Sequence, residues 1–137
     1  MARVLVFDVN ETLLDLRVLD STSERAFGDA AVRQLSNAGV APLLDEIMSV
    51  ETSGKFKPAR VVYEMAATQL GVTTAQMRMV AAHDWDIAGA MRAGCAGAYL
   101  LRAGMVLNPL YPRPDIVEAD FHRLTERIVE VEKGETS

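Results

Sequence analysis

Asp8 is the residue of this chain whose type and position most directly suggest chemistry. It follows four consecutive apolar residues, Val4 to Phe7, which predict a strand buried on both faces, as in a parallel sheet. Open α/β sheets build their sites at the carboxyl ends of such strands, and a partly buried carboxylate near a cation can act there as a nucleophile. An isolated Asp would more simply end a strand or cap a loop, so the residues around Asp8 decide its interpretation.

The residues that follow favour the nucleophile. Asp8, Asn10 and Thr12, with the tail Leu13 to Asp15, resemble the first motif of the haloacid dehalogenase superfamily, in which an apolar strand precedes Asp-x-(Asp/Tyr/Asn)-x-Thr. In the phosphatase branches of that family the residue at the position of Asn10 is an Asp that protonates the leaving oxygen. An amide cannot do this, and a halide needs no proton to leave, so Asn10 favours the 2-haloacid dehalogenase branch. Glu11 departs from the motif, which most often has Gly there.

A second segment resembles the third motif of the family, Lys-Pro-x-x-x-x-Tyr. Its matching residues are Lys57, Pro58 and Tyr63. The resemblance implies that Lys57 neutralises two carboxylates at the sheet edge and keeps the nucleophile ionised. Taken alone, Lys57 could be a solvated residue before a helix-starting Pro, and Tyr63 a core aromatic with a wet hydroxyl.

A third segment, Met79 to Asp86, resembles the fourth motif in its dehalogenase version. The resemblance implies that Asp86 pairs with Lys57 and helps to position the hydrolytic water. His83 stands where dehalogenases more often have Asn, and it could hydrogen-bond that water or serve a structural role. Trp85, the only Trp, could form an apolar wall beside the substrate or pack in the core. The resemblance thus implies the catalytic residues Asp8, Lys57 and Asp86 and a substrate-binding set of Asn10, Thr12, Tyr63, His83 and Trp85.

We expect neither a metal nor another cofactor. Metal-dependent members of the family carry an acidic residue at the position of Ala82, and both Asn10 and Ala82 lack the carboxylate that magnesium favours. Asp84 is one extra carboxylate and weak evidence for a metal. Displacement at a haloalkyl carbon develops no phosphoryl charge for magnesium to stabilise.

The composition limits the class of protein. A chain of 137 residues and 14.9 kDa, half of it hydrophobic, suits one folded domain. Its apolar runs are too short to cross a bilayer, and Met1 to Phe7 lacks the layout of a signal peptide. The net charge of −5 without a basic cluster argues against nucleic acid or an anionic membrane as partner. The single cysteine, Cys95, is expected to be a small core residue, and its lack of a disulfide partner fits the cytoplasm.

Predicted strands and helices alternate along the chain, which indicates one layered α/β domain. The resemblance implies a Rossmannoid core of the haloacid dehalogenase type, with three layers, a mostly parallel sheet and no cap domain, over residues 1–137. The expected strands are Val4 to Phe7, Glu46 to Val50, Met77 to Ala82, Ala98 to Arg102 and a strand or turn at Ile116 to Phe121. The expected helices are Leu19 to Ala38, Pro58 to Leu70 (closed by Gly71), Asp86 to Arg92 and His122 to Glu132, with a frayed tail from Lys133 to Ser137.

The segments of the resemblance do not join as the family joins them. Complete members carry a helical cap and a second core strand ending in a Ser/Thr-Asn motif, whereas residues 2–33 run here directly into residues 34–129. Ser36-Asn37 could be that second motif, but no apolar strand precedes it, so we interpret the junction near 33–34 as an internal deletion.

Three functions remain open. The first is hydrolytic dehalogenation of a small 2-haloalkanoic acid through an aspartyl ester, which loss of the cap would impair. The second is a non-catalytic remnant of the fold that acts as an assembly module. The third, a small capless phosphatase, is opposed by Asn10 and Ala82. Because loss of the second strand would expose the edge beside Val4 to Phe7, we also expect a homo-oligomer.

Overall fold

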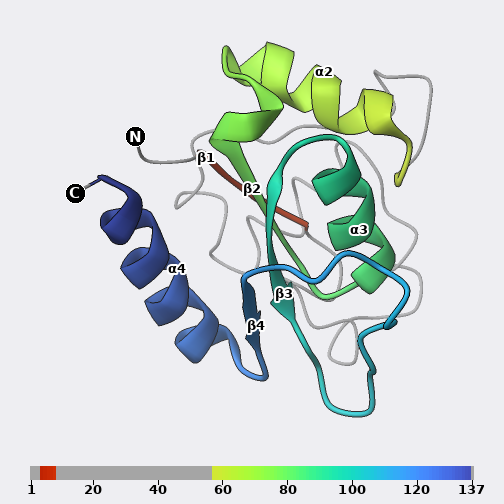
Figure 1. Cartoon of the computed structure of the whole chain (residues 1–137), viewed down its shortest axis with the longest axis vertical. Helices are drawn as coiled ribbons and strands as arrows, with labels where there is room; N and C mark the ends of the chain where they lie inside the picture. The colour runs from red at the N-terminus through yellow and green to blue at the C-terminus, as the bar shows by residue number, and fades with distance from the viewer. Residues whose placement is uncertain (1–3, 9–56, 137) are drawn as a thin grey trace, which may run out of the picture.

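The structure, a computed structural model, describes residues 4–8 and 57–136 (Figure 1). In this part of the chain four strands form one parallel sheet in the order β1-β2-β3-β4. The strands are β1 (Val4–Phe7), β2 (Met77–Ala81), β3 (Ala96–Leu100) and β4 (Ile116–Glu118). The helices are α2 (Arg60–Leu70), the 3-10 turn η5 (Thr74–Gln76), α3 (Asp84–Arg92) and α4 (Phe121–Thr136).

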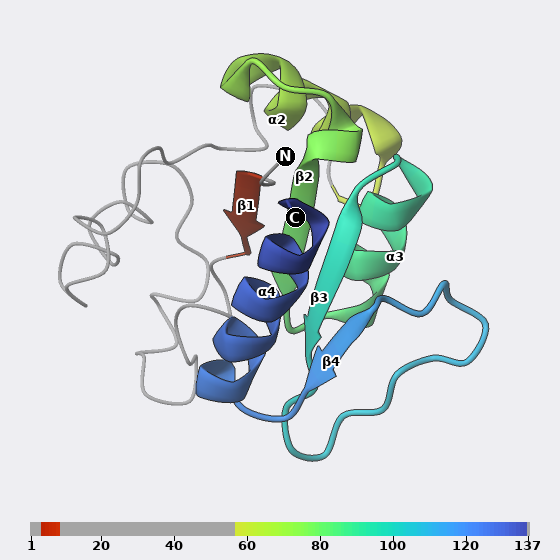
Figure 2. The ribbon, with the colours of Figure 1, turned by 60° about the vertical axis from the view of Figure 1, so that its left-hand side comes forward.

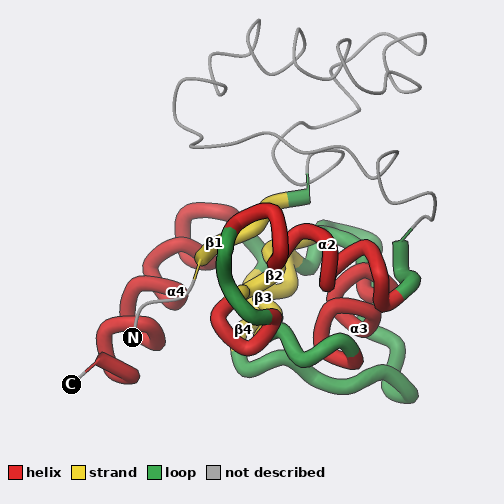
Figure 3. Tube along the Cα trace, turned by 90° about the horizontal axis from the view of Figure 1, so that it is seen from above, coloured by secondary structure: helices red, strands yellow, loops and turns green. Residues whose placement is uncertain are grey.

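The described elements form three layers, with the sheet between α4 on one face and α2 and α3 on the other (Figures 2 and 3). Alternate residues of β2 serve the two faces, as the two-residue period of a strand requires. Met79 packs in the cluster that contains Tyr63 and Ile87, whereas Val80 packs in the cluster that contains Leu124 and Ile128. The expected three-layer α/β core with a parallel sheet is confirmed.

The ends of several elements differ from the predicted ones. Helix α3 begins at Asp84 instead of Asp86, because two acidic residues in its first turn complement the helix dipole. Helix α2 begins at Arg60 instead of Pro58, since Ala59 is still extended as its N-cap. Its predicted end is confirmed: Gly71 closes it with φ +72°.

Strand β3 spans Ala96–Leu100 and not Ala98 to Arg102. Its pairing with β2 starts at Ala96, opposite Arg78, and the amide of Arg102 donates to the carbonyl of Leu100 in a turn that ends the strand. Of the two alternatives for Ile116 to Phe121, the structure has a strand at Ile116–Glu118. The turn η5 was not predicted, although Thr73 and Gln76 form a capping box there.

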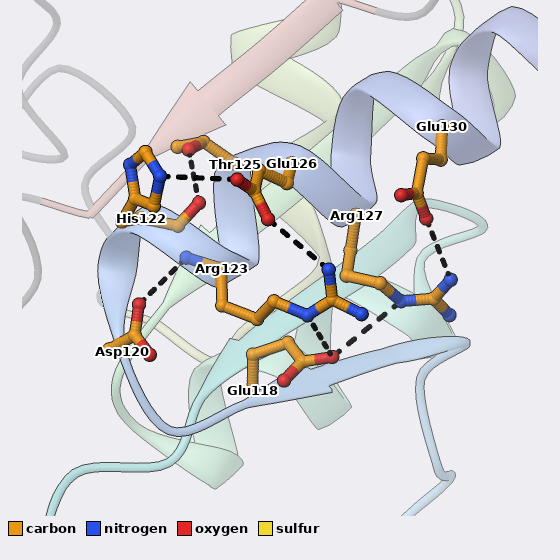
Figure 4. Close-up of polar contacts among 8 residues, drawn as sticks. All are labelled: Glu118, Asp120, His122, Arg123, Thr125, Glu126, Arg127 and Glu130. Atoms are coloured by element: carbon orange, nitrogen blue, oxygen red, sulfur yellow. Dashed lines mark hydrogen bonds and ion pairs between the residues drawn. The ribbon is translucent and has the colours of Figure 1, made fainter.

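Helix α4 continues to Thr136, so the frayed tail expected from Lys133 is wrong for the described residues. Leu124 and Ile128 are buried against the sheet and hold the helix in place. The Asp120 carboxylate accepts from the amide of Arg123 at 2.7 Å, which starts the helix. Ion pairs cover the solvent face (Figure 4): Arg123 and Arg127 both lie near Glu118, and Arg127 also binds Glu130. Exposed pairs of this kind contribute little stability each.

A buried arginine joins the sheet to α4. Arg78, the second residue of β2, is fully buried and donates to Glu132 of α4 at 2.6 Å and to Asp115, just before β4, at 2.6 Å. It also donates to the carbonyl of Gly97 at 2.6 Å. The cluster lies towards the amino ends of the strands, away from Asp8, and therefore serves the packing of the core.

Some predictions fall on residues outside the described part. These are the helix Leu19 to Ala38, the strand Glu46 to Val50, Ser36-Asn37, the junction near 33–34, and the side chains of Asn10 and Thr12. Within the described part, none of the helices is both long and apolar enough to cross a membrane.

Candidate active site

Two neighbouring strands deliver the acidic residues to the same edge of the sheet. Asp8 directly follows β1, and its amide donates to the carbonyl of Val80 at 2.9 Å, which extends the pairing with β2. The chain after β2 turns through His83 into α3, whose first turn carries Asp86. Because parallel strands end at one edge, residues that are 78 positions apart in the chain come to lie close together.

Lys57 connects the two carboxylates. Its Nζ donates to Oδ1 of Asp8 at 3.0 Å and to Oδ2 of Asp86 at 2.8 Å. The Asp86 side chain has no exposed surface, and the Asp8 and Lys57 side chains are largely covered. Charge-assisted hydrogen bonds in such surroundings are strong and fix the geometry of the three groups.

Tyr63 holds the other side of Asp86. Its buried hydroxyl donates to Oδ1 of Asp86 at 2.7 Å, and it lies 3.1 Å from the Asp86 carbonyl. Gly89 of α3 makes this approach possible, because a Cβ there would lie 2.5 Å from Cβ of Pro58 and 3.0 Å from the Tyr63 hydroxyl. Tyr63 is thus both a core aromatic and a ligand of the acidic cluster, and its hydroxyl is not wet.

The electrostatics favour an ionised Asp8. Burial by itself raises the pKa of the Asp8 carboxyl, but the contact with His83 and the charge of Lys57 outweigh burial and leave this pKa below its ordinary value. Burial lowers the pKa of the Lys57 ammonium, but the charges of Asp86 and Asp8 raise it overall. At neutral pH Asp8 is therefore a carboxylate and Lys57 a cation.

The pKa values of Asp86 and Tyr63 are both raised, because burial dominates at these two groups. Burial raises the pKa of the Asp86 carboxyl, and Lys57 and Tyr63 lower it only in part. Burial and the Asp86 charge raise the pKa of the Tyr63 hydroxyl far above its ordinary value. Tyr63 therefore keeps its proton at neutral pH and donates it to the hydrogen bond with Asp86.

His83 and Trp85 lie on the open side of the cluster. Nδ1 of His83 is 3.7 Å from Oδ2 of Asp8, the oxygen that Lys57 does not contact. The indole of Trp85 stacks on the imidazole, with ring centroids 5.2 Å apart and 22° between the planes. Trp85 is 40% exposed, so of the two alternatives left open for it, packing in the core is excluded.

Cys95 lies among the buried core residues, as predicted. Burial and the charge of Asp86 raise the pKa of its thiol to about 11, so it is not a nucleophile at neutral pH.

The sequence analysis missed two contacts that shape the site. One is Gly89, whose small size lets Pro58 and Tyr63 approach α3; a glycine inside a predicted helix was the available signal. The other is Asp84, whose Oδ2 accepts from the amide of Asn108 at 3.2 Å and ties the loop after β3 to the start of α3. The sequence does not reveal this bond, because the two residues are distant in the chain.

A parallel α/β sheet with an Asp–Lys–Asp cluster at its carboxyl edge is the core that the sequence motifs imply for the haloacid dehalogenase superfamily. No family model matches the chain. The chain is 31% identical over 102 residues to an (S)-2-haloacid dehalogenase of Pseudomonas sp. (strain YL), covering 74% of this chain and 42% of that protein. It is 25% identical over 100 residues to haloacetate dehalogenase H-2 of Moraxella sp. (strain B), and this match covers 73% of this chain and 43% of that protein.

Solved structures agree with the sequence matches. The L-2-haloacid dehalogenase of Xanthobacter autotrophicus with chloropropionic acid covalently bound has a TM-score of 0.63 at 24% identity, covering 75% of this chain and 50% of that one. A defluorinating L-2-haloacid dehalogenase has a TM-score of 0.61 at 26% identity, and this match covers 74% of this chain and 42% of that one. The chain is therefore related in sequence and in fold to the (S)-2-haloacid dehalogenases of the haloacid dehalogenase superfamily. It spans less than half the length of the curated relatives named above.

Proposed function

We propose that the chain is the catalytic core of a hydrolase that removes halide from a small 2-haloalkanoic acid, with Asp8 as nucleophile. The observation that carries the proposal is the Lys57 ammonium, which contacts Asp8 at 3.0 Å and Asp86 at 2.8 Å. One cation between two carboxylates keeps Asp8 ionised and fixes its position at the sheet edge. The named relatives act on such acids, which supports this substrate class.

The reaction has two halves. In the first, a carboxylate oxygen of Asp8 attacks the carbon that bears the halogen, the carbon–halogen bond breaks and halide leaves with its electron pair. In the second, water hydrolyses the aspartyl ester at its carboxyl carbon and releases the 2-hydroxy acid. Asn10, Thr12 and Trp85 remain proposed as substrate contacts.

We propose that the reaction needs no metal and no other cofactor. Ala82, which is buried directly after β2, offers a methyl group where metal-dependent members carry a carboxylate. Within the described residues, no group of three or more His, Cys, Asp or Glu side chains is placed to share a metal ion.

The test is halide release from (S)-2-chloropropionate by the 137-residue chain, with Asp8→Asn as the matched control. Release that depends on Asp8 supports the proposal. Absence of both halide and a covalent adduct with the wild-type chain would contradict it and favour the non-catalytic assembly module. Phosphatase activity towards p-nitrophenyl phosphate would favour the third alternative.

We further propose that residues 1–137 form one core with an internal deletion near 33–34, that the chain forms a homo-oligomer, and that it works in the reducing cytoplasm. The exposed Leu5 on β1, which lies at the edge of the described sheet, supports the oligomer. The unpaired Cys95 supports the reducing compartment.

A further inference from the structure

We propose that His83, and not Asp86, is the base that activates the hydrolytic water; this inference rests on the proposed dehalogenase function. His83 follows β2 and is the N-cap of α3, with an extended backbone at φ −116° and ψ 125°. Its position between two packed elements brings the imidazole to the nucleophile. Its side chain is 21% exposed, so water reaches it.

The two oxygens of Asp8 face different partners. Oδ1 accepts from Lys57 at 3.0 Å, and Oδ2 lies 3.7 Å from Nδ1 of His83. An ester formed on Asp8 therefore keeps an ammonium on one side of its carboxyl carbon and an imidazole on the other. A water that hydrogen-bonds to the imidazole would therefore be close to that carbon.

Asp86 is poorly placed for the same task. Its Oδ1 accepts from Tyr63 at 2.7 Å and its Oδ2 from Lys57 at 2.8 Å, and its side chain has no exposed surface. Lys57 lies between Asp86 and Asp8 and contacts both. A proton transferred to Asp86 would also remove the charge that holds Lys57 beside the nucleophile. Asp86 is thus a positioning residue for Lys57.

The imidazole is held in its orientation. Trp85 stacks on it at 5.2 Å, and Asp84, between the two aromatic residues in the chain, accepts from the amide of Asn108 at 3.2 Å. Among the residues that the structure describes, the charged groups near His83 are Asp8 directly after β1, Lys57 from the segment before α2, and Asp84 and Asp86 from α3. Imidazole is the side chain suited to accept and return a proton near neutral pH.

The step balances in atoms and charge. A nitrogen of His83 takes a proton from water, and the oxygen of that water forms a bond to Cγ of the Asp8 ester. The tetrahedral intermediate collapses as the bond breaks between Cγ and the ester oxygen, the former Asp8 oxygen that is bonded to the substrate carbon. The leaving alkoxide takes the proton from the imidazolium and departs as the 2-hydroxy acid. Asp8, now a carboxylic acid, loses a proton to solvent and returns to the carboxylate.

The test separates the two halves of the reaction in the His83→Ala chain. After mixing with (S)-2-chloropropionate, we measure free halide, 2-hydroxypropionate and the intact mass of the protein. We expect one halide per active chain, an alkyl adduct that persists on Asp8, and steady-state turnover lowered by roughly 100-fold or more, the usual size of general base catalysis. Added imidazole should restore hydrolysis of the adduct, which a merely structural role would not permit.

His122→Ala is the matched control, because His122 is the other histidine and its side chain is 87% exposed on α4. It should leave both halves unchanged. In Asp86→Asn we expect a slow halide burst and no adduct, since Lys57 loses one of its two carboxylate partners and is held less firmly beside Asp8. The inference is overturned if the His83→Ala chain turns over without accumulating the adduct. It is also overturned if that chain loses the halide burst. Asp86→Asn that accumulates the adduct also overturns it. A wild-type chain that forms neither halide nor adduct overturns the proposed function and, with it, this role of His83.

Discussion

At the scale of single residues, Lys57 determines the state of the candidate site. Two carboxylates at one sheet edge would repel each other, and one of them would then hold a proton. The ammonium between Asp8 and Asp86 removes that repulsion, and the pKa of Asp8 is lowered although burial opposes ionisation. The lowered pKa means that Asp8 remains ionised when the solution is made mildly acidic.

The first prediction concerns Asp8 as the site of the covalent intermediate. In a single turnover with excess enzyme in heavy-oxygen water, we expect the label in the Asp8 carboxylate and not in the first 2-hydroxy acid released. The reason is that water attacks the carboxyl carbon of the ester, so the first product keeps an oxygen that belonged to Asp8. Mass spectrometry of the product and of the peptide that contains Asp8 measures both. Label in the first product would rule out the covalent route.

The second prediction concerns metal. Because Ala82 and Asn10 supply no carboxylate, we expect halide release to be unchanged in excess chelator and not increased by added magnesium. Halide is measured before and after chelation with the same protein stock. Activity lost with chelator and recovered with magnesium would contradict this prediction and favour the phosphatase alternative.

At the scale of elements, the packing of α2 against α3 positions Lys57 and Tyr63. The contact depends on Gly89, since a Cβ there would lie 2.5 Å from Pro58 and 3.0 Å from the Tyr63 hydroxyl. A glycine in a helix normally lowers stability by about 1 kcal/mol relative to Ala. The close approach of the two elements is the physical reason why this position favours Gly despite that cost.

The third prediction tests this contact with Gly89→Ala. Forced overlap costs about 1–3 kcal/mol, more than the roughly 1 kcal/mol that Ala gains in a helix. We expect a small net loss in the free energy of unfolding and a larger loss of halide release, because Pro58 and Tyr63 must move. Gly134→Ala in α4 is the control, since no atom lies within 4 Å of the added Cβ, and it should be neutral or stabilising. Equal behaviour of the two variants would contradict the argument.

The fourth prediction concerns the buried Arg78 that joins β2, α4 and Asp115. Arg78→Ala leaves Glu132 without its buried partner, and breaking a buried ion pair costs about 3–5 kcal/mol. We expect a loss near the lower end of that range, about 3 kcal/mol, because the Asp115 side chain is half exposed and can bind water instead. Denaturant unfolding measures this loss as the change in the free energy of unfolding. Arg127→Ala on the solvent face is the control and should shift the midpoint little, and an equally large shift there would contradict the role given to Arg78.

The main elements could be predicted because strand and helix patterns are local in the sequence, whereas the cluster of Asp8, Lys57 and Asp86 was expected only because three segments resemble motifs of the haloacid dehalogenase superfamily. The ends of several elements could not be predicted. The start of α3 depends on its acidic first turn, and the limits of β3 depend on pairing with β2, which is a contact between distant residues. The burial of Arg78 was also missed, since its partners Asp115 and Glu132 are 37 and 54 residues away.

At the scale of the whole molecule, the chain contains the sheet edge that carries Asp8, the proposed nucleophile, yet it spans less than half of the curated relatives it matches. The described sheet has β1 at one edge, paired with β2 along its whole length. The central consequence is that Asp8 follows the outermost described strand. The state of that edge therefore affects both assembly and the position of Asp8.

The last prediction is that the chain forms a dimer or a larger homo-oligomer in which the β1 edge takes part. An apolar edge strand is a template for pairing with another chain, and Leu5 on β1 is 39% exposed. We expect light scattering at micromolar concentration to give a mass of at least twice the 14.9 kDa of one chain. Leu5→Lys should shift the mass towards the monomer, because a charge beside the edge opposes pairing while the exposed position tolerates Lys. Val106→Lys, at an exposed apolar residue of the loop after β3, is the control and should leave the mass unchanged. A wild-type chain that is a monodisperse, cooperatively unfolding monomer contradicts the oligomer, and an oligomer insensitive to Leu5→Lys places the interface elsewhere.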